Sequence, residues 1–170
     1  MPSLPGVRWV RALAIATVVA VSVVGCGSDS TGGDSTLSDE IDAAPPESFF
    51  LGSEFDGLAL TAVVPAEQGA GGSTSFIYGD CEPPAGEGGC APPLEVQNWL
   101  ECSRPQPDSL AGFDAVKGAP VKRGSPGSGV EVYTGTSTVV LFGHGAVDAV
   151  PELRHPGDDE PVSEFEPPAC

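Results

Sequence analysis

Short apolar runs separated by glycine and proline occupy the middle of this chain. Residues 58–64, 73–78 and 94–99 are rich in strand-forming side chains, and each is bounded by turn-forming residues. In the third run Leu94 and its alternate neighbours are apolar or small, and Trp99 lies at the end. A period of two predicts a strand with one apolar face. The pattern therefore predicts three short strands before residue 100.

The clearest pattern is the sequence GVEVYTGTSTVVLFG in residues 129–143. Two strand-forming runs flank a turn-like segment that contains Gly135, which predicts a hairpin. One face carries valine and leucine, and the other is also apolar at Tyr133, Val140 and Phe142. Because both faces are apolar, we expect this hairpin to lie in the centre of a sheet with both faces covered.

Two segments have helical spacing. Asp108 or Ser109 is a candidate cap for a short helix with Leu110, Phe113 and Val116 on one side, although Gly112 weakens it. Residues 146–153 have a second helical pattern.

In that second pattern Asp148 is the candidate cap, because Pro151 would then fall in the first turn. We therefore predict an α+β domain with an antiparallel sheet of about four or five strands and one or two short helices. A β sandwich is the alternative.

Residues 1–25 have the pattern of a secretory signal. Arg8 and Arg11 precede 13 uncharged, mainly apolar residues, too few for a membrane span of about 20. The residues Val23-Val24-Gly25-Cys26 follow directly and resemble the lipobox of bacterial lipoproteins.

The lipobox resemblance implies that Cys26 becomes the first residue and carries a diacylglycerol with acyl chains such as palmitate. Two chains anchor a protein stably, so we expect localisation at the cell membrane, on its extracytoplasmic face. The alternative is an ordinary secretory signal with an incidental Cys26.

Composition divides the rest of the chain into three segments. Residues 26–48 are mainly small and acidic, which predicts a disordered tether behind the lipid. Residues 49–155 hold enough apolar side chains for one globular domain. Residues 156–170 form an acidic, proline-rich tail that ends in Cys170.

The charge balance excludes one class of partner. The chain has 7 Lys and Arg against 24 Asp and Glu, a formal charge of −17. Without residues 1–25 there are 5 basic and 24 acidic residues, a balance of −19. Nucleic-acid binding requires clustered basic side chains, so we expect no nucleic-acid partner.

Four cysteines follow Cys26. An even number in an exported protein predicts two disulfides, for which three connectivities exist. Cys81 and Cys90 flank a Pro- and Gly-rich turn, so we pair them, and Cys102 then pairs with Cys170. A four-thiolate zinc site is the alternative, but no CxxC pair occurs. We expect no metal and no other cofactor.

A second resemblance lies in the middle of the chain. The residues YGDC at 78–81, GGCAPPL at 88–94 and VQN at 96–98 resemble a pattern in uncharacterised extracytoplasmic proteins of high-GC actinobacteria. The resemblance covers about 25 residues and implies kinship without a known activity.

Residues with catalytic chemistry are sparse. The chain has two histidines, His144 and His155, and no GxSxG motif. The glycine-rich stretch at residues 124–129 is interpreted as a turn rather than a phosphate-binding loop, because a strand follows it. Asp80, beside Cys81, is the acid that we would inspect first, although capping a turn is its simpler role.

Two functional hypotheses follow, besides a purely structural spacer that predicts neither a cleft nor an exposed patch. The first is a non-catalytic lipoprotein domain that binds a protein or cell-wall partner, with Trp99 or the pair Phe49-Phe50 as candidate anchors, although core packing is the simpler role for these aromatics. The second is a small envelope hydrolase that uses paired carboxylates. An enzyme requires converging polar groups in a cleft, whereas a binding domain requires an exposed patch on a rigid face.

Overall fold

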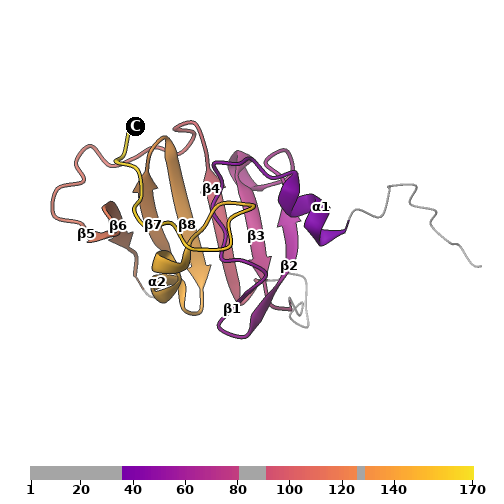
Figure 1. The fold of residues 1–170 in the computed structure, drawn as a ribbon. Helices are drawn as coiled ribbons and strands as arrows, with labels where there is room; N and C mark the ends of the chain where they lie inside the picture. The colour runs from indigo at the N-terminus through magenta and orange to yellow at the C-terminus, as the bar shows by residue number, and fades with distance from the viewer. Residues whose placement is uncertain (1–35, 81–90, 126–128) are drawn as a thin grey trace, which may run out of the picture. The chain divides into compact units, whose positions relative to one another are not determined.

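The computed structural model describes residues 36–80, 91–125 and 129–170 (Figure 1). They form one antiparallel sheet of eight strands in the order β1-β2-β3-β4-β8-β7-β6-β5. The strands are β1 (Glu54–Phe55), β2 (Leu58–Val64), β3 (Thr74–Tyr78), β4 (Leu94–Trp99), β5 (Asp114–Val116), β6 (Ala119–Arg123), β7 (Val130–Thr134) and β8 (Ser137–Gly143). The helices are α1 (Leu37–Asp42), α2 (Ala146–Ala149) and the 3-10 turns η1 (Ala70–Gly72) and η2 (Val150–Glu152).

The strands and the hairpin expected from the apolar pattern are confirmed. β2, β3 and β4 occupy the three predicted runs, and β7 and β8 form the predicted hairpin, in which Thr134 pairs with Ser137. β8 lies between β4 and β7, so the hairpin is central in the sheet. The alternation in β4 is also present, because Leu94, Val96 and Asn98 are buried and the residues between them are half-buried.

The sheet is larger than the four or five predicted strands because two further hairpins occur. A two-residue turn at Asp56-Gly57 joins β1 to β2, and another at Lys117-Gly118 joins β5 to β6. All four turn residues have positive φ, the conformation that two-residue hairpins of type I′ require. The Asp-Gly pair is the local signal that would have revealed β1.

The predicted helix near residues 108–116 is wrong. Residues 114–116 instead form β5, where Asp114 pairs with Val121. Gly112 has a φ of 89°, which interrupts any helix through this segment. The side chain of Phe113 stacks against Tyr133, with ring centroids 6.1 Å apart, so its apolar surface is covered by the sheet.

The second predicted helix is present in shorter form. α2 has four residues and continues directly into η2. Its N-cap is Gly145 in the left-handed conformation, not Asp148, and Pro151 lies at the start of η2. The domain is thus mainly an antiparallel sheet with few helical residues. All eight strands of the described chain belong to one sheet, so the sandwich alternative does not hold for them.

One face of the sheet, here called the core face, carries the hydrophobic core. Successive strands pair so that apolar side chains form rows across it, as in Phe76 opposite Val96 and Val96 opposite Leu141. The segments packed on this face are residues 49–51, α2 with η2, and the C-terminal segment. The buried core comprises Phe49, Phe50, Leu51, Leu60, Phe76, Tyr78, Leu94, Val96, Ala119, Val121, Val130, Val132, Val139, Leu141, Ala146, Ala149, Val150, Leu153 and Phe165.

The N-terminal covering segment is held by side chains of the sheet. Asn98 is fully buried; its Oδ1 accepts from Phe49 N at 2.6 Å and its Nδ2 donates to Phe49 O at 2.9 Å. The Tyr78 hydroxyl accepts from Leu51 N at 2.7 Å and donates to Gly52 O at 3.1 Å. Burial raises the pKa of Tyr78, so the hydroxyl keeps the proton that it donates.

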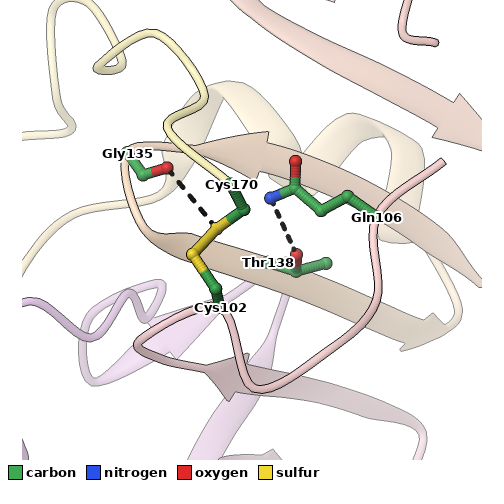
Figure 2. The surroundings of a disulfide bond; sticks show 5 residues. All are labelled: Cys102, Gln106, Gly135, Thr138 and Cys170. Atoms are coloured by element: carbon green, nitrogen blue, oxygen red, sulfur yellow. Dashed lines mark hydrogen bonds between the residues drawn. A yellow bond between two sulfur atoms is a disulfide. The ribbon is translucent and has the colours of Figure 1, made fainter. Parts of the chain in front are cut away.

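The C-terminal segment, residues 156–170, is fastened in the same way. Phe165 N donates to Lys117 O at 2.8 Å, and Lys117 Nζ donates to Pro151 O and Val162 O at 2.5 and 2.7 Å. Its end carries the predicted disulfide between Cys102 and Cys170, 68 residues apart in the sequence (Figure 2). The acidic tail is therefore part of the folded domain.

The described part of the predicted tether contains structure. α1 begins after Thr36, whose hydroxyl accepts from Asp39 N while the Asp39 carboxylate accepts from Thr36 N. This reciprocal capping offsets the cost of starting a short helix. Leu37 and Ile41 pack against the core, which the composition of the segment did not indicate.

No helix in residues 36–80, 91–125 or 129–170 is long and apolar enough to cross a membrane.

We predict that Asn98→Leu destabilises the domain by about 3 kcal/mol, because Phe49 would then keep two buried backbone groups without partners. Urea denaturation followed by circular dichroism measures the free energy of unfolding. Gln97→Leu, on the same strand but the opposite face, is the matched control and should destabilise the domain by about 1 kcal/mol or less, because its partners Glu95 and Trp99 remain partly open to water. An equal loss in both variants would contradict a special role for Asn98.

Candidate functional site

The second face of the sheet, here called the outer face, differs from the core face. Its side chains belong to none of the residues in the hydrophobic core cluster, and Figure 1 shows α2 and the C-terminal segment on the opposite side. The register aligns Gln97 with Val140 and Val140 with Glu131 across β4, β8 and β7. The outer face comprises Ser75, Ile77, Glu95, Gln97, Trp99, Lys122, Glu131, Tyr133, Thr138, Val140 and Phe142.

Along β4 three outer-face side chains form a hydrogen-bonded row. Gln97 Nε2 donates to Glu95 Oε1 at 2.9 Å, and Trp99 Nε1 donates to Gln97 Oε1 at 3.4 Å. Residues two apart on a strand share a face, so the alternating sequence places them in contact. All three are half-buried, and the row is ordered while remaining partly open to solvent.

The indole of Trp99 is enclosed on two sides. The guanidinium carbon of Arg104 lies 5.2 Å from the ring centroid, within the range of a cation–π contact. A Cβ at Gly71 would lie 2.4 Å from Trp99 Cη2, so only glycine leaves room for the ring edge. Arg104 and Gly71 together fix the orientation of the indole.

Arg104 connects this row to β7. Its Nη2 lies 2.6 Å from Glu131 Oε1, while Lys122 Nζ lies 3.5 Å from Glu131 Oε2. The Tyr133 hydroxyl donates to Glu131 Oε2 in a short hydrogen bond. One carboxylate thus accepts from three side chains of three different segments.

The charges and hydrogen bonds of this cluster determine the protonation states of Glu131 and Tyr133. Burial alone would raise the pKa of Glu131, but hydrogen bonds from Tyr133 and Arg104 and the charges of Arg104 and Lys122 hold it below its ordinary value. Burial, and then the hydrogen bond and charge of Glu131, raise the pKa of Tyr133. At neutral pH Glu131 is therefore ionised and Tyr133 protonated. The pKa values of both groups are thus shifted away from neutral pH, near which a general acid or base has its pKa.

The histidines and Asp80 lie apart from this cluster. His155 Nδ1 lies 2.9 Å from Ser48 O, and its ring packs on Phe49 with centroids 4.3 Å apart. His144 is exposed in the turn before α2, and Asp80 is exposed after β3. His155 thus fastens a covering segment, and neither His144 nor Asp80 contributes to the outer face.

The remaining candidates from the sequence lie in the core, in a loop or outside the described residues. Phe49 and Phe50 are buried in the core, so neither is an exposed anchor. The glycine-rich stretch lies in the connection between β6 and β7, with residues 126–128 outside the description. Cys26, Cys81 and Cys90 also lie outside the described residues.

A separate hollow of about 580 Å³ lies beside the β1–β2 hairpin. Its lining includes His144, Asp148, Glu152 and Arg154. Among the residues that the structure describes, no group of three or more His, Cys, Asp or Glu side chains is arranged to hold a metal ion.

Sequence reasoning identified Trp99 but missed Arg104, Glu131 and Tyr133. The alternation of Glu131 and Tyr133 in β7 places them on one face, and this could have been read from the predicted hairpin. The contact with Arg104 could not, because it depends on the irregular connection between β4 and β5.

Comparison with known proteins gives no match to a family model, to a curated protein or to a solved structure.

We predict that Arg104→Met raises the pKa of Glu131 and removes roughly 1 kcal/mol of stability at neutral pH. A lowered folded-state pKa contributes stability above the unfolded pKa, and this contribution is lost as the pH falls through the folded value. The difference between wild type and variant should accordingly shrink below the ordinary glutamate pKa of about 4.3. Urea denaturation across this pH range measures it.

Lys122→Met is the matched control for this prediction. Lys122 is more exposed than Arg104 and lies farther from the carboxylate, so its effect should be smaller. A loss in Arg104→Met that does not depend on pH would show that the ion pair contributes little.

Proposed function

We propose that this protein is a lipid-anchored extracytoplasmic lipoprotein whose domain binds a protein partner through the outer face of its sheet, without catalysing a reaction. The observation that supports this best is the ordered, half-buried row Glu95, Gln97 and Trp99, flanked by Ile77 and Phe142. Mixed apolar and polar side chains on a rigid sheet suit protein recognition. The α-helices of the described chain, α1 and α2, pack against the core instead.

A protein partner fits this face better than a wall glycan. Sugar rings are commonly held by stacking on an open aromatic face, and Arg104 already lies over the indole of Trp99. The strong negative charge of the chain favours a partner with a basic surface around its contact region, because complementary charge accelerates association.

The positions and protonation states of the carboxylates on this face also favour binding over hydrolysis. Glu95 and Glu131 lie on β4 and β7, with β8 between them and Glu95 two residues out of line, so their backbones are about 12 Å apart. Glu95 accepts from Gln97, and Glu131 accepts from Tyr133 and Arg104. Paired-carboxylate hydrolysis needs one acid kept protonated by a raised pKa, whereas the pKa of Glu131 is lowered.

The lipid anchor is the second part of the proposal, supported by the lipobox resemblance at residues 23–26. Cys26→Ser should move the protein from the membrane fraction to the soluble extracytoplasmic fraction, because no thioether-linked lipid can form. Fractionation and immunoblotting measure the distribution. Unchanged membrane association in the variant would refute the anchor.

The binding face is tested by site-specific photo-crosslinking in cells that produce the protein. We predict that a benzophenone amino acid at position 97 gives discrete protein adducts, and that the same probe at Val147, an exposed apolar residue of α2, does not. Adducts are identified by mass spectrometry. Adducts of equal yield at both positions would contradict a contact surface on the outer face.

A wall partner would give a different result. Retention of the purified domain on isolated cell walls, with no protein adduct at position 97, would replace the protein partner by a glycan. Absence of both would refute binding through this face.

A further inference from the structure

We propose that the Cys102–Cys170 disulfide is a thiol-sensitive latch that holds the β4–β5 connection, residues 100–113, closed over part of the outer face. The opening of this latch is a property of the fold. Its effect on partner binding rests on the proposed function.

The connection covers the outer face above β8 and β7. Arg104 reaches Glu131, Gln106 Nε2 donates to Thr138 Oγ1 at 3.5 Å, and Phe113 stacks on Tyr133. Tyr133, Thr138 and Val140 are at most 2% exposed, although no core-face segment can reach them. They point away from the core, Tyr133 and Thr138 contact the connection directly, and Val140 lies opposite Glu131, which Arg104 reaches, so the connection contributes to their burial.

Beyond these side-chain contacts the connection is weakly fastened. For residues 103–113 the backbone hydrogen bonds in the described structure are local, from Ser103 N to Leu100 O and from Phe113 N to Leu110 O. The last tie to the sheet backbone is Cys102 N to Thr136 O at 2.8 Å. A segment with few backbone ties opens at lower free energy than the sheet beside it.

The turn that enters the connection is strained. Glu101 and Cys102 have φ values of 52° and 56°, a left-handed conformation that residues other than glycine adopt at a cost. The disulfide lies at the second of these residues. The turn also has its own hydrogen bond, from Ser103 N to Leu100 O at 2.9 Å, and the disulfide is the covalent tie at this point. Breaking the disulfide leaves only hydrogen bonds to hold the strained turn, so its relaxation would carry the connection away from the face.

The disulfide lies at the surface, where an incoming thiol can approach it. Cys102 and Cys170 are both exposed, and both line a hollow of about 560 Å³ together with Gln106 and Pro168. Figure 2 shows the disulfide beside Gly135, in the tight turn between β7 and β8. After cleavage, the end of the chain would be held by hydrogen bonds to Gly135 O alone, from Ala169 N at 2.6 Å and from the Cys170 thiol, whose Sγ lies 4.0 Å away.

The exchange needs a dithiol, which an extracytoplasmic disulfide reductase would supply. One thiolate of the dithiol attacks either Sγ; a new S–S bond forms as the Cys102–Cys170 bond breaks, and the other Sγ leaves and takes a proton. The second thiolate of the dithiol then attacks its partner sulfur in the mixed disulfide and releases the remaining cysteine. Two electrons pass to the chain, and the dithiol becomes a disulfide.

Opening would change the chemistry of the outer face. Val140 and Tyr133 would become accessible, and Arg104 would leave the indole of Trp99. The half-buried row of β4 would then continue into an apolar surface over β8 and β7. The latch therefore sets how much of the outer face a partner can reach.

The test uses the full chain with Trp9→Phe, so that Trp99 is the only tryptophan, and Cys81→Ser with Cys90→Ser, so that one disulfide remains among the later cysteines. Acrylamide quenching of Trp99 fluorescence is measured before and after dithiothreitol. Hydrogen exchange and far-UV circular dichroism are measured on the same samples. Cys102→Ser/Cys170→Ser without reductant, in an otherwise native chain, gives an independent open state.

If the disulfide acts as a latch, reduction raises the acrylamide quenching constant of Trp99 about twofold, because the Arg104 guanidinium no longer covers the ring. Exchange of residues 103–113 becomes about tenfold faster while β4 is unchanged. The dichroism spectrum stays native, and reoxidation restores the closed values. Unchanged quenching and exchange would overturn the proposal, and so would loss of the native spectrum, since the bond would then be a structural staple.

Photo-crosslinking at position 97 in the Cys102→Ser/Cys170→Ser variant separates the two proposals. A changed adduct yield relative to the oxidised chain supports regulation of the binding face. An unchanged, measurable yield overturns that regulation. If fluorescence and exchange show opening but neither state gives adducts, the latch stands and the proposed function fails.

Discussion

The fold depends on buried side chains of the sheet that hydrogen-bond to the backbone of the irregular segments covering it. The core face is covered mainly by irregular chain, and irregular chain brings backbone N–H and C=O groups that must find partners when buried. Asn98 supplies both an acceptor and a donor to Phe49, and Tyr78 does the same for Leu51 and Gly52. Without these hydrogen bonds, the favourable free energy of burying the apolar side chains of residues 49–51 would be offset by the cost of unpaired backbone groups.

The same solution recurs at the C-terminal end. Lys117 places its ammonium group against two carbonyl oxygens, and Thr134 Oγ1 donates to Glu166 O at 3.0 Å. These contacts turn an acidic, proline-rich tail into a cover for the core, with Phe165 buried at its centre. The covering segments lie on the core face, and the outer face is covered in part by the β4–β5 connection. This difference between the two faces is the basis of the proposed binding surface.

Much of the sheet could be predicted because strand signals are local. The alternation in residues 94–99 and the two runs around Gly135 specify strands and faces through the period of two alone. The short strands β1, β5 and β6 were missed because two or three paired residues give little periodicity; only their turns were informative. The helix expected near residue 110 does not form, because Phe113 packs on Tyr133 of β7 and this contact overrides a weak helical pattern.

The sequence by itself determined the central strands and the face that each side chain takes, because these depend on spacing along the chain. The pairing of Cys102 with Cys170 followed from the sequence only by elimination, and it is the structure that shows the two cysteines bonded. Only the tertiary structure decided that residues 36–48 contain a capped helix, that the acidic tail covers the core, and that Arg104, Glu131 and Tyr133 meet on the outer face. Each of these depends on contacts between residues far apart in the chain, whose free energy exists only once the sheet has brought them together.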